Sequence, residues 1–229
     1  MLRRAIALSA LLFTTAASAQ VSGSVALVSD YRFRGVSLSD ERPAAQLALA
    51  YDQRDGWYAG MLASTVRPSG TLRTQLLTYL GLARPLGAGL DWEAGVDYAS
   101  IVGEGRYDYS EAYVGLSTEH YSGRLYYTPH DFGQPSPALY ATIDRHWQLT
   151  DRLRLLGHLG LLRRNGHADD ESSHYRADAR AGLGMTWRDY HLQLFWTIVH
   201  GSDAPYPFGY RPGSQPARQV WGVSLSRSW

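Results

Sequence analysis

The chain has 229 residues, of which 22 are basic, 21 are acidic and none is cysteine. A formal net charge of +1 provides no basic excess for a nucleic-acid partner, and the lack of cysteine excludes disulfides and thiolate metal sites. Sixteen tyrosines, seven tryptophans and 23 glycines are unusual for a soluble core but suit strands that are apolar on one face only.

Residues 1–19 predict a signal peptide. Arg3 and Arg4 precede an apolar run that extends from Ala5 to about Ala17, and residues 17–19 have the A-x-A form of a cleavage site. Cleavage there would leave residues 20–229 as one exported domain. No apolar run in that domain approaches the roughly 18 residues that a transmembrane helix requires, so we expect either a soluble fold or a barrel.

Alternation of apolar and polar residues predicts strands along the whole exported domain. In residues 174–187, for example, Tyr175 and Leu183 occupy odd-numbered positions and Asp178 occupies an even-numbered one. Side chains at alternate positions of a strand point to the same face, and we call each such set of positions a parity. A helix, with a period of 3.6, cannot keep two such sets apart. We predict twelve strands, at about 23–34, 44–52, 57–66, 74–84, 90–100, 109–118, 123–128, 138–149, 153–163, 174–187, 190–201 and 217–229.

The predicted connections alternate between short and long, as they do in bacterial outer-membrane barrels with short periplasmic turns and longer outer loops. Nine of the ten prolines fall in the long connections, and Pro85 is expected to begin a short turn. We therefore predict an all-β fold, a transmembrane antiparallel up-and-down β-barrel of twelve strands in the cell outer membrane.

Aromatic residues predict where the membrane interfaces lie, because Trp and Tyr rings favour the boundary between water and lipid. One tryptophan at a strand end would be ordinary packing, but five share the outward parity beside short turns or at the C-terminus. This expected periplasmic girdle consists of Trp57, Trp92, Trp147, Trp187 and Trp229. Outward aromatic residues are expected at the other end as well, namely Tyr31, Phe33, Tyr98, Tyr127 and Tyr175.

The last predicted strand alternates and finishes on Trp229. It resembles the C-terminal signal by which outer-membrane barrels are recognised for assembly, although Arg227 departs from that signal. The barrel assembly machinery is therefore an expected partner. The alternative is the closing strand of a soluble sandwich, which rarely has a reason to end on an exposed Trp.

Two segments resemble a known family. The first is Ser29-Asp30-Tyr31-Arg32-Phe33-Arg34-Gly35-Val36-Ser37, followed by Pro43-Ala44-Ala45-Gln46 and Gly56-Trp57-Tyr58-Ala59-Gly60. The second is Tyr109-Ser110-Glu111-Ala112-Tyr113-Val114-Gly115-Leu116-Ser117. Both are similar to the TorF family, also called the Gcw_chp family. This resemblance implies an exported outer-membrane protein to which a channel role is attributed.

Many of the positions that are expected to point into the barrel carry charged side chains, which predicts a charged lumen. The expected pore-lining residues are Asp30, Arg32, Arg34, Glu93, Asp97, Glu111, Arg124, Asp144, His146, Arg154, His158, Arg176, Asp178 and Arg180. Carboxylates dominate the fifth and sixth strands, and arginines dominate the ninth, tenth and first strands, so we expect a field across the lumen. The alternative is a buried charge network that plugs a narrow barrel.

These patterns favour a porin-like channel for passive diffusion of small polar or ionic solutes, with outer-membrane lipid and lipopolysaccharide as its surroundings. No cofactor, metal site or enzymatic activity is expected. A barrel lipid hydrolase would need a Ser and a His on one face, and Ser173 and His174 fall on opposite faces. A structural or binding barrel is an alternative, in which the loop at 202–216 would bind a partner. The acidic residues 169–171 are either a solvated loop tip or a cation site. The sequence does not predict the oligomeric state.

Overall fold

The structure is a computed structural model that describes residues 20–165, 174–201 and 218–229. The predicted signal peptide, the acidic tip at 169–171 and the loop at 202–216 lie outside the described residues. Within the described part, no helix is both long enough and apolar enough to cross a membrane.

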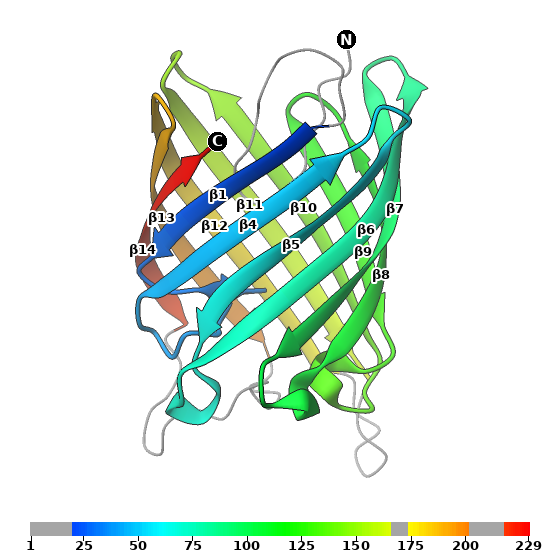
Figure 1. Ribbon diagram of the computed structural model, residues 1–229, viewed down its shortest axis with the longest axis vertical. Coiled ribbons are helices and arrows are strands. Elements are labelled where there is room, and N and C mark those ends of the chain that lie inside the picture. Colours follow the sequence, from blue (N-terminus) through cyan, green and yellow to red (C-terminus); the bar gives the residue numbers. More distant parts are fainter. Residues whose placement is uncertain (1–19, 166–173, 202–217) are drawn as a thin grey trace.

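Twelve antiparallel strands form a closed barrel in which each strand pairs with its chain neighbours and β1 closes the ring against β14 (Figure 1). The barrel strands are β1 (Gln20–Val28), β4 (Ala44–Asp52), β5 (Trp57–Val66), β6 (Arg73–Gly87), β7 (Leu90–Ile101), β8 (Tyr109–Ser117), β9 (Tyr121–Thr128), β10 (Ala138–Gln148), β11 (Leu153–Arg164), β12 (His174–Trp187), β13 (Tyr190–Gly201) and β14 (Gln219–Ser228). The predicted fold class and strand number are confirmed.

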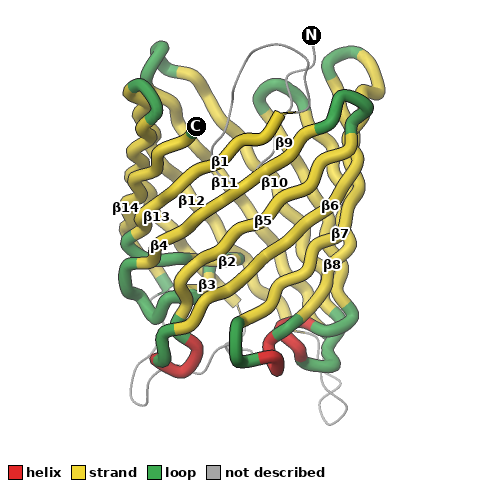
Figure 2. The backbone as a smooth tube through the Cα atoms, viewed as in Figure 1, coloured by secondary structure: helices red, strands yellow, loops and turns green. Residues whose placement is uncertain are grey.

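The two ends of the barrel differ. The short turns lie at the end where β1 begins and the chain finishes, which is the upper end in Figure 1. The opposite end carries the longer described connections and three short 3-10 turns, η1 (Pro68–Gly70), η2 (Gly105–Tyr107) and η3 (Asp131–Gly133) (Figure 2). Short turns and long loops therefore separate as the alternating connection lengths predict.

The prediction of a first strand at 23–34 is wrong beyond Val28. Residues 29–43, which we call the inner loop, leave the wall and fold back on themselves through two short strands, β2 (Arg32–Phe33) and β3 (Val36–Ser37) (Figure 2). The chain reverses at Arg34 and Gly35, whose φ angles are 52° and 76°. Alternation continues through this segment in the sequence, but left-handed backbone conformations end a strand.

Pro85 does not begin a turn, contrary to the sequence-based expectation. β6 continues to Gly87, and Pro85 lies opposite Asp91 beside a shift of register between Pro85 and Gly87. Proline is tolerated at such an irregularity because the ladder already lacks a hydrogen bond there. The tight turn is formed instead by Ala88 and Gly89, with φ angles of 52° and 75°.

The wall has an apolar outer face and a polar inner face. On β12, Tyr175, Leu183 and Met185 are exposed, whereas Asp178 is buried on the opposite parity. The same alternation follows the other strands, with Leu125, Ile143 and Leu159 among the exposed apolar side chains. Because side chains on a strand alternate between faces, the exposed set covers the outside of the barrel and the buried set faces its lumen.

Candidate functional site: the lumen

The tryptophans predicted to form a girdle all lie on the outer face at the short-turn end. Trp57, Trp147, Trp187 and Trp229 are between 40% and 61% exposed, and Trp92 is partly buried. At the other end Tyr98, Tyr127 and Tyr175 are also exposed on the outside. The expectation for Tyr31 and Phe33 is wrong, because both residues belong to the inner loop and pack inside the barrel.

The predicted pore-lining residues of the wall lie on the parity opposite to the exposed apolar side chains. They are Glu93, Asp97, Glu111, Arg124, Asp144, His146, Arg154, His158, Arg176, Asp178 and Arg180. Asp30, Arg32 and Arg34 were expected on the first strand of the wall. They are instead buried in the inner loop, where the chain leaves the sheet.

The inner loop is held together by Asp30. The Arg32 Nε donates to Asp30 Oδ2 at 2.6 Å, and the Arg32 Nη1 donates to the backbone oxygen of Gly35 at 3.0 Å. Ser37 and Ser39 donate their hydroxyl protons to Asp30 Oδ1 at 2.5 Å and 3.1 Å. The Asp30 carboxylate thus accepts hydrogen bonds from one charged and two neutral donors within the loop. Asp30 and Arg32 therefore stabilise the fold of the inner loop.

Arg34, by contrast, reaches the far wall of the lumen. The inner loop follows β1, and β8, β9 and β10 lie on the opposite side of the ring. The Arg34 Nη2 donates to Glu111 Oε2 on β8 at 2.5 Å, and its guanidinium lies 5.4 Å from the Tyr126 ring and 4.4 Å from the Tyr140 ring. Burial lowers the pKa of Arg34, but Glu111 raises it, so the net pKa is raised and the group stays charged.

An apolar cluster packs the rest of the inner loop against the barrel at the long-loop end. Leu38 is fully buried, and Phe33 contacts Phe132 edge-on with ring centroids 6.0 Å apart. Tyr109 of β8 also contacts Phe132, at 4.8 Å. The cluster consists of Leu38, Val66, Ala99, Ile101, Tyr107, Tyr109 and Phe132, with Tyr31, Phe33 and Leu77 beside it. Such packing has the character of a protein core, so the inner loop narrows the lumen.

A second ion pair lies within the wall itself. The Arg124 Nε donates to Glu93 Oε1 at 2.5 Å and its Nη2 donates to Oε2 at 3.1 Å, while the Tyr58 hydroxyl donates to Oε2 at 2.8 Å. Glu93 on β7 and Arg124 on β9 are both in register with Gly115 on β8. A Cβ atom at Gly115 would lie 2.8 Å from Glu93 Oε1, so the missing side chain lets the pair cross β8.

His158 links two carboxylates on neighbouring strands. Its Nδ1 lies 2.8 Å from Asp144 Oδ1 on β10, and its Nε2 lies 3.0 Å from Asp178 Oδ1 on β12. The Tyr140 hydroxyl donates to Asp178 Oδ2 at 3.0 Å, and the Tyr140 ring also contacts Arg34. This network is therefore continuous with the contact between the inner loop and the far wall.

The lumen also contains aromatic and charged side chains beyond the predicted pore-lining residues. Tyr58, Tyr113, Tyr126 and Tyr140 all project from inward positions, and the alternation would have included them had aromatic residues been counted as lumen groups. Arg164 forms a buried ion pair with Asp131, in which its Nε donates to Oδ2 at 2.8 Å. Arg164 follows the inward parity one residue past the predicted strand end, whereas nothing in the sequence indicated Asp131.

The predicted separation of charge across the lumen is only partly present. The expected acidic wall is largely neutralised, because Glu111 pairs with Arg34 and Glu93 pairs with Arg124. Asp97 has no ion-pairing partner among the described residues. On the other side, Arg154 and Arg180 form no ion pair with any described residue, and Arg180 lies 4.7 Å from the Phe195 ring. Of these three described lumen side chains without an ion pair, two are cationic and one is acidic.

Among the described residues, no group of three or more histidines and carboxylates is arranged so that it could hold a metal ion. His120 and His146 are in edge-on contact at 5.8 Å near the short-turn end, but two rings alone do not make up a ligand set.

A closed twelve-stranded antiparallel barrel with an apolar exterior and a charged lumen defines a porin-like β-barrel. The chain belongs to the Gcw_chp family, described as a bacterial protein of unknown function, whose family model matches residues 13–228. The resemblance to the Gcw_chp family is thereby confirmed. Curated proteins gave no match to this chain.

Solved structures of porins have the same fold. The KdgM porin superposes with a TM-score of 0.57 at 12% identity, covering 91% of this chain and 99% of that chain. A KdgM porin in complex with disordered oligogalacturonate gives a TM-score of 0.54 at 10% identity, covering 91% and 98%. The NanC porin gives 0.53 at 13% identity, covering 91% and 99%. At such identities the similarity shows the fold alone.

Proposed function

We propose that this protein is an outer-membrane channel that admits small polar or ionic solutes by passive diffusion. The proposal depends on one observation above all: a closed barrel carries its charges inside and its apolar side chains outside. Such a wall satisfies its backbone hydrogen bonds internally and exposes mainly apolar side chains to lipid. Passive diffusion needs no cofactor, so the charged lumen is sufficient for this role.

Insertion into a membrane is tested by Leu159, which is 62% exposed on the outer face near the middle of β11. Leu159→Arg should lower the free energy of unfolding in lipid vesicles by about 2–4 kcal/mol, because a charge is costly at the bilayer midplane. Leu159→Met keeps an apolar side chain and should cost less than about 1.5 kcal/mol. Urea titration of the refolded proteins measures both, and equal stability of the two variants would argue against contact with lipid.

Conduction is tested through the unpaired arginines of the lumen. Since Arg154 and Arg180 lack ion-pairing partners among the described residues, wild type should conduct and should prefer anions. Neutralising both with Gln should shift the reversal potential toward cation preference in a planar bilayer under a salt gradient. The shift should shrink in 1 M salt, where the Debye length is about 3 Å.

A matched control removes two positive charges outside the lumen. Arg188 lies beside the Trp187 ring at a short turn, and Arg227 lies beside the Tyr190 ring on the outer face. Replacing both with Gln should leave the selectivity unchanged. If both double variants shift the reversal potential equally, Arg154 and Arg180 do not face a conducting path.

The inner loop favours a second candidate function, a structural or binding barrel with a plugged lumen. Its Arg34 crosses to Glu111 and its apolar residues pack against the long-loop end. Folded wild-type protein without measurable conductance would support this candidate in place of the channel.

For either function, assembly through the C-terminal strand is part of the proposal, since Trp229 exchanges backbone hydrogen bonds with Gly23 of β1 at 3.0 and 3.1 Å.

A further inference from the structure

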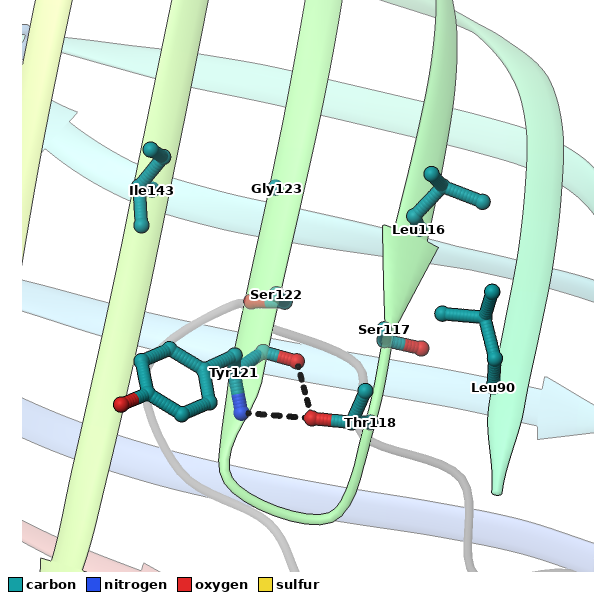
Figure 3. Close-up of a pocket in the computed structure, with 8 residues that line it drawn as sticks. All are labelled: Leu90, Leu116, Ser117, Thr118, Tyr121, Ser122, Gly123 and Ile143. Atoms are coloured by element: carbon teal, nitrogen blue, oxygen red, sulfur yellow. Dashed lines mark hydrogen bonds between the residues drawn. The ribbon is translucent and has the colours of Figure 1, made fainter. Parts of the chain in front are cut away.

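An apolar groove lies on the outer face near the short turns between β8 and β9. Leu90, Leu116, Thr118, Tyr121, Gly123 and Ile143 line it. Figure 3 shows Leu116 on one side and Ile143 on the other, with Gly123 between them. The strand register agrees, because Gly123 pairs with Leu116 of β8 and with Ile143 of β10.

The groove exists because Gly123 occupies an outward position without a side chain. A Cβ atom there would meet only the backbone oxygen of Thr142, at 3.4 Å, which is ordinary contact. There is therefore enough space for a side chain at this position, and the surrounding backbone does not require glycine. A larger side chain would fill the groove while leaving the sheet intact.

A cation without a counter-ion lies beside the groove. Arg145 is the next outward residue after Ile143 on β10, and it pairs in register with Tyr121, which lines the groove. Its guanidinium contacts two rings, 4.4 Å from the Tyr121 centroid and 3.9 Å from the Trp147 centroid. No carboxylate among the described residues forms an ion pair with Arg145, and its Nε is buried without a hydrogen-bond partner.

We propose that this groove and Arg145 together bind one anionic phospholipid, with an acyl chain in the groove and the phosphate at Arg145. The inference depends on the membrane insertion that the proposed function includes. The order along the wall fits such a lipid: Arg145 and Tyr121 lie nearer the short turns, and Gly123 and Ile143 lie one row deeper. Tyr and Trp side chains of this kind favour the headgroup level, and an unpaired guanidinium matches a phosphate.

Native mass spectrometry of the folded full chain in detergent tests the site. The protein is incubated with equal amounts of phosphatidylglycerol and phosphatidylcholine. Wild type should retain one phosphatidylglycerol in preference to phosphatidylcholine. Arg145→Gln should reduce that retention about tenfold, the effect of losing one charge-assisted contact. Gly123→Leu should reduce retention of both lipids, because its side chain occupies the groove.

Arg227→Gln is the matched control, since Arg227 also lies beside an outer-face tyrosine ring, at 5.7 Å from Tyr190, but does not line the groove. It should retain phosphatidylglycerol as wild type does. The proposal is overturned if Arg145→Gln binds as wild type, or if Arg227→Gln weakens binding equally. Heat-modifiability on gels verifies that each variant is folded before it is measured.

This experiment is separate from the test of conduction. A wild-type barrel that conducts but shows no lipid preference would overturn the lipid site alone. A barrel that binds phosphatidylglycerol without conducting would retain the lipid site and reject the channel.

Discussion

Replacing Arg34 with Met is expected to release the inner loop from the far wall and to increase single-channel conductance. Arg34 pairs with the buried carboxylate of Glu111, and both side chains are less than 5% exposed. Breaking a buried ion pair by removing one partner costs about 3–5 kcal/mol, because the other charge stays behind. Loss of the ring contacts with Tyr126 and Tyr140 adds to this cost.

Two measurements on the refolded protein check this expectation. Planar-bilayer recording should show a larger conductance than wild type. Limited proteolysis should cleave within residues 29–43 in the variant, whereas the buried inner loop of wild type should be protected. Arg106→Met is the control, because the Arg106 pair with Glu104 is exposed and should be worth at most about 1 kcal/mol. Unchanged conductance and protection in Arg34→Met would show that the apolar cluster alone holds the loop.

Replacing Arg124 with Met should destabilise the wall without opening the lumen. This change leaves Glu93 buried with only the hydroxyl of Tyr58 as a hydrogen-bond donor, and we expect a loss of about 3–5 kcal/mol. Glu93→Gln in the same chain removes the stranded charge and should restore part of that stability. Because the pair joins β7 to β9 within the sheet, the inner loop should keep its place.

A double-mutant cycle with urea unfolding in lipid vesicles measures the coupling between Glu93 and Arg124. We expect the two single variants to differ from additivity by at least about 1 kcal/mol, as neighbouring charged groups in one network do. Conductance should stay at the wild-type value throughout. Additive effects would mean that the two side chains do not act as a pair, and a rise in conductance would mean that the wall and the inner loop are coupled.

The alternation of apolar and polar residues was enough to predict the strands of the barrel wall and the two faces of each strand. Side chains alternate strictly along a strand, so the parity of Asp178 and Leu183 separates the lumen from the outside without knowledge of the neighbouring strands. Turn residues between the runs likewise predicted twelve strands and their closure into a barrel. The inward positions of Arg164 and of the lumen tyrosines also follow from the alternation, because Arg164 continues the period of its strand and the tyrosines lie within predicted strands.

Partnership within the lumen was decided by tertiary structure. The alternation predicts which face of the sheet a side chain occupies, but not its position along the barrel axis or its partners on other strands. The sequence around Glu93 and Arg124 therefore did not indicate that they form a pair across Gly115. The inner loop is the clearest case. Its residues alternate like a strand, and only the reversal at Arg34 and Gly35 and the packing of Phe33 on Phe132 take them into the lumen. The physical reason is distance along the chain: alternation is a property of adjacent residues, whereas Arg34 and Glu111 are 77 positions apart and meet only when the barrel closes.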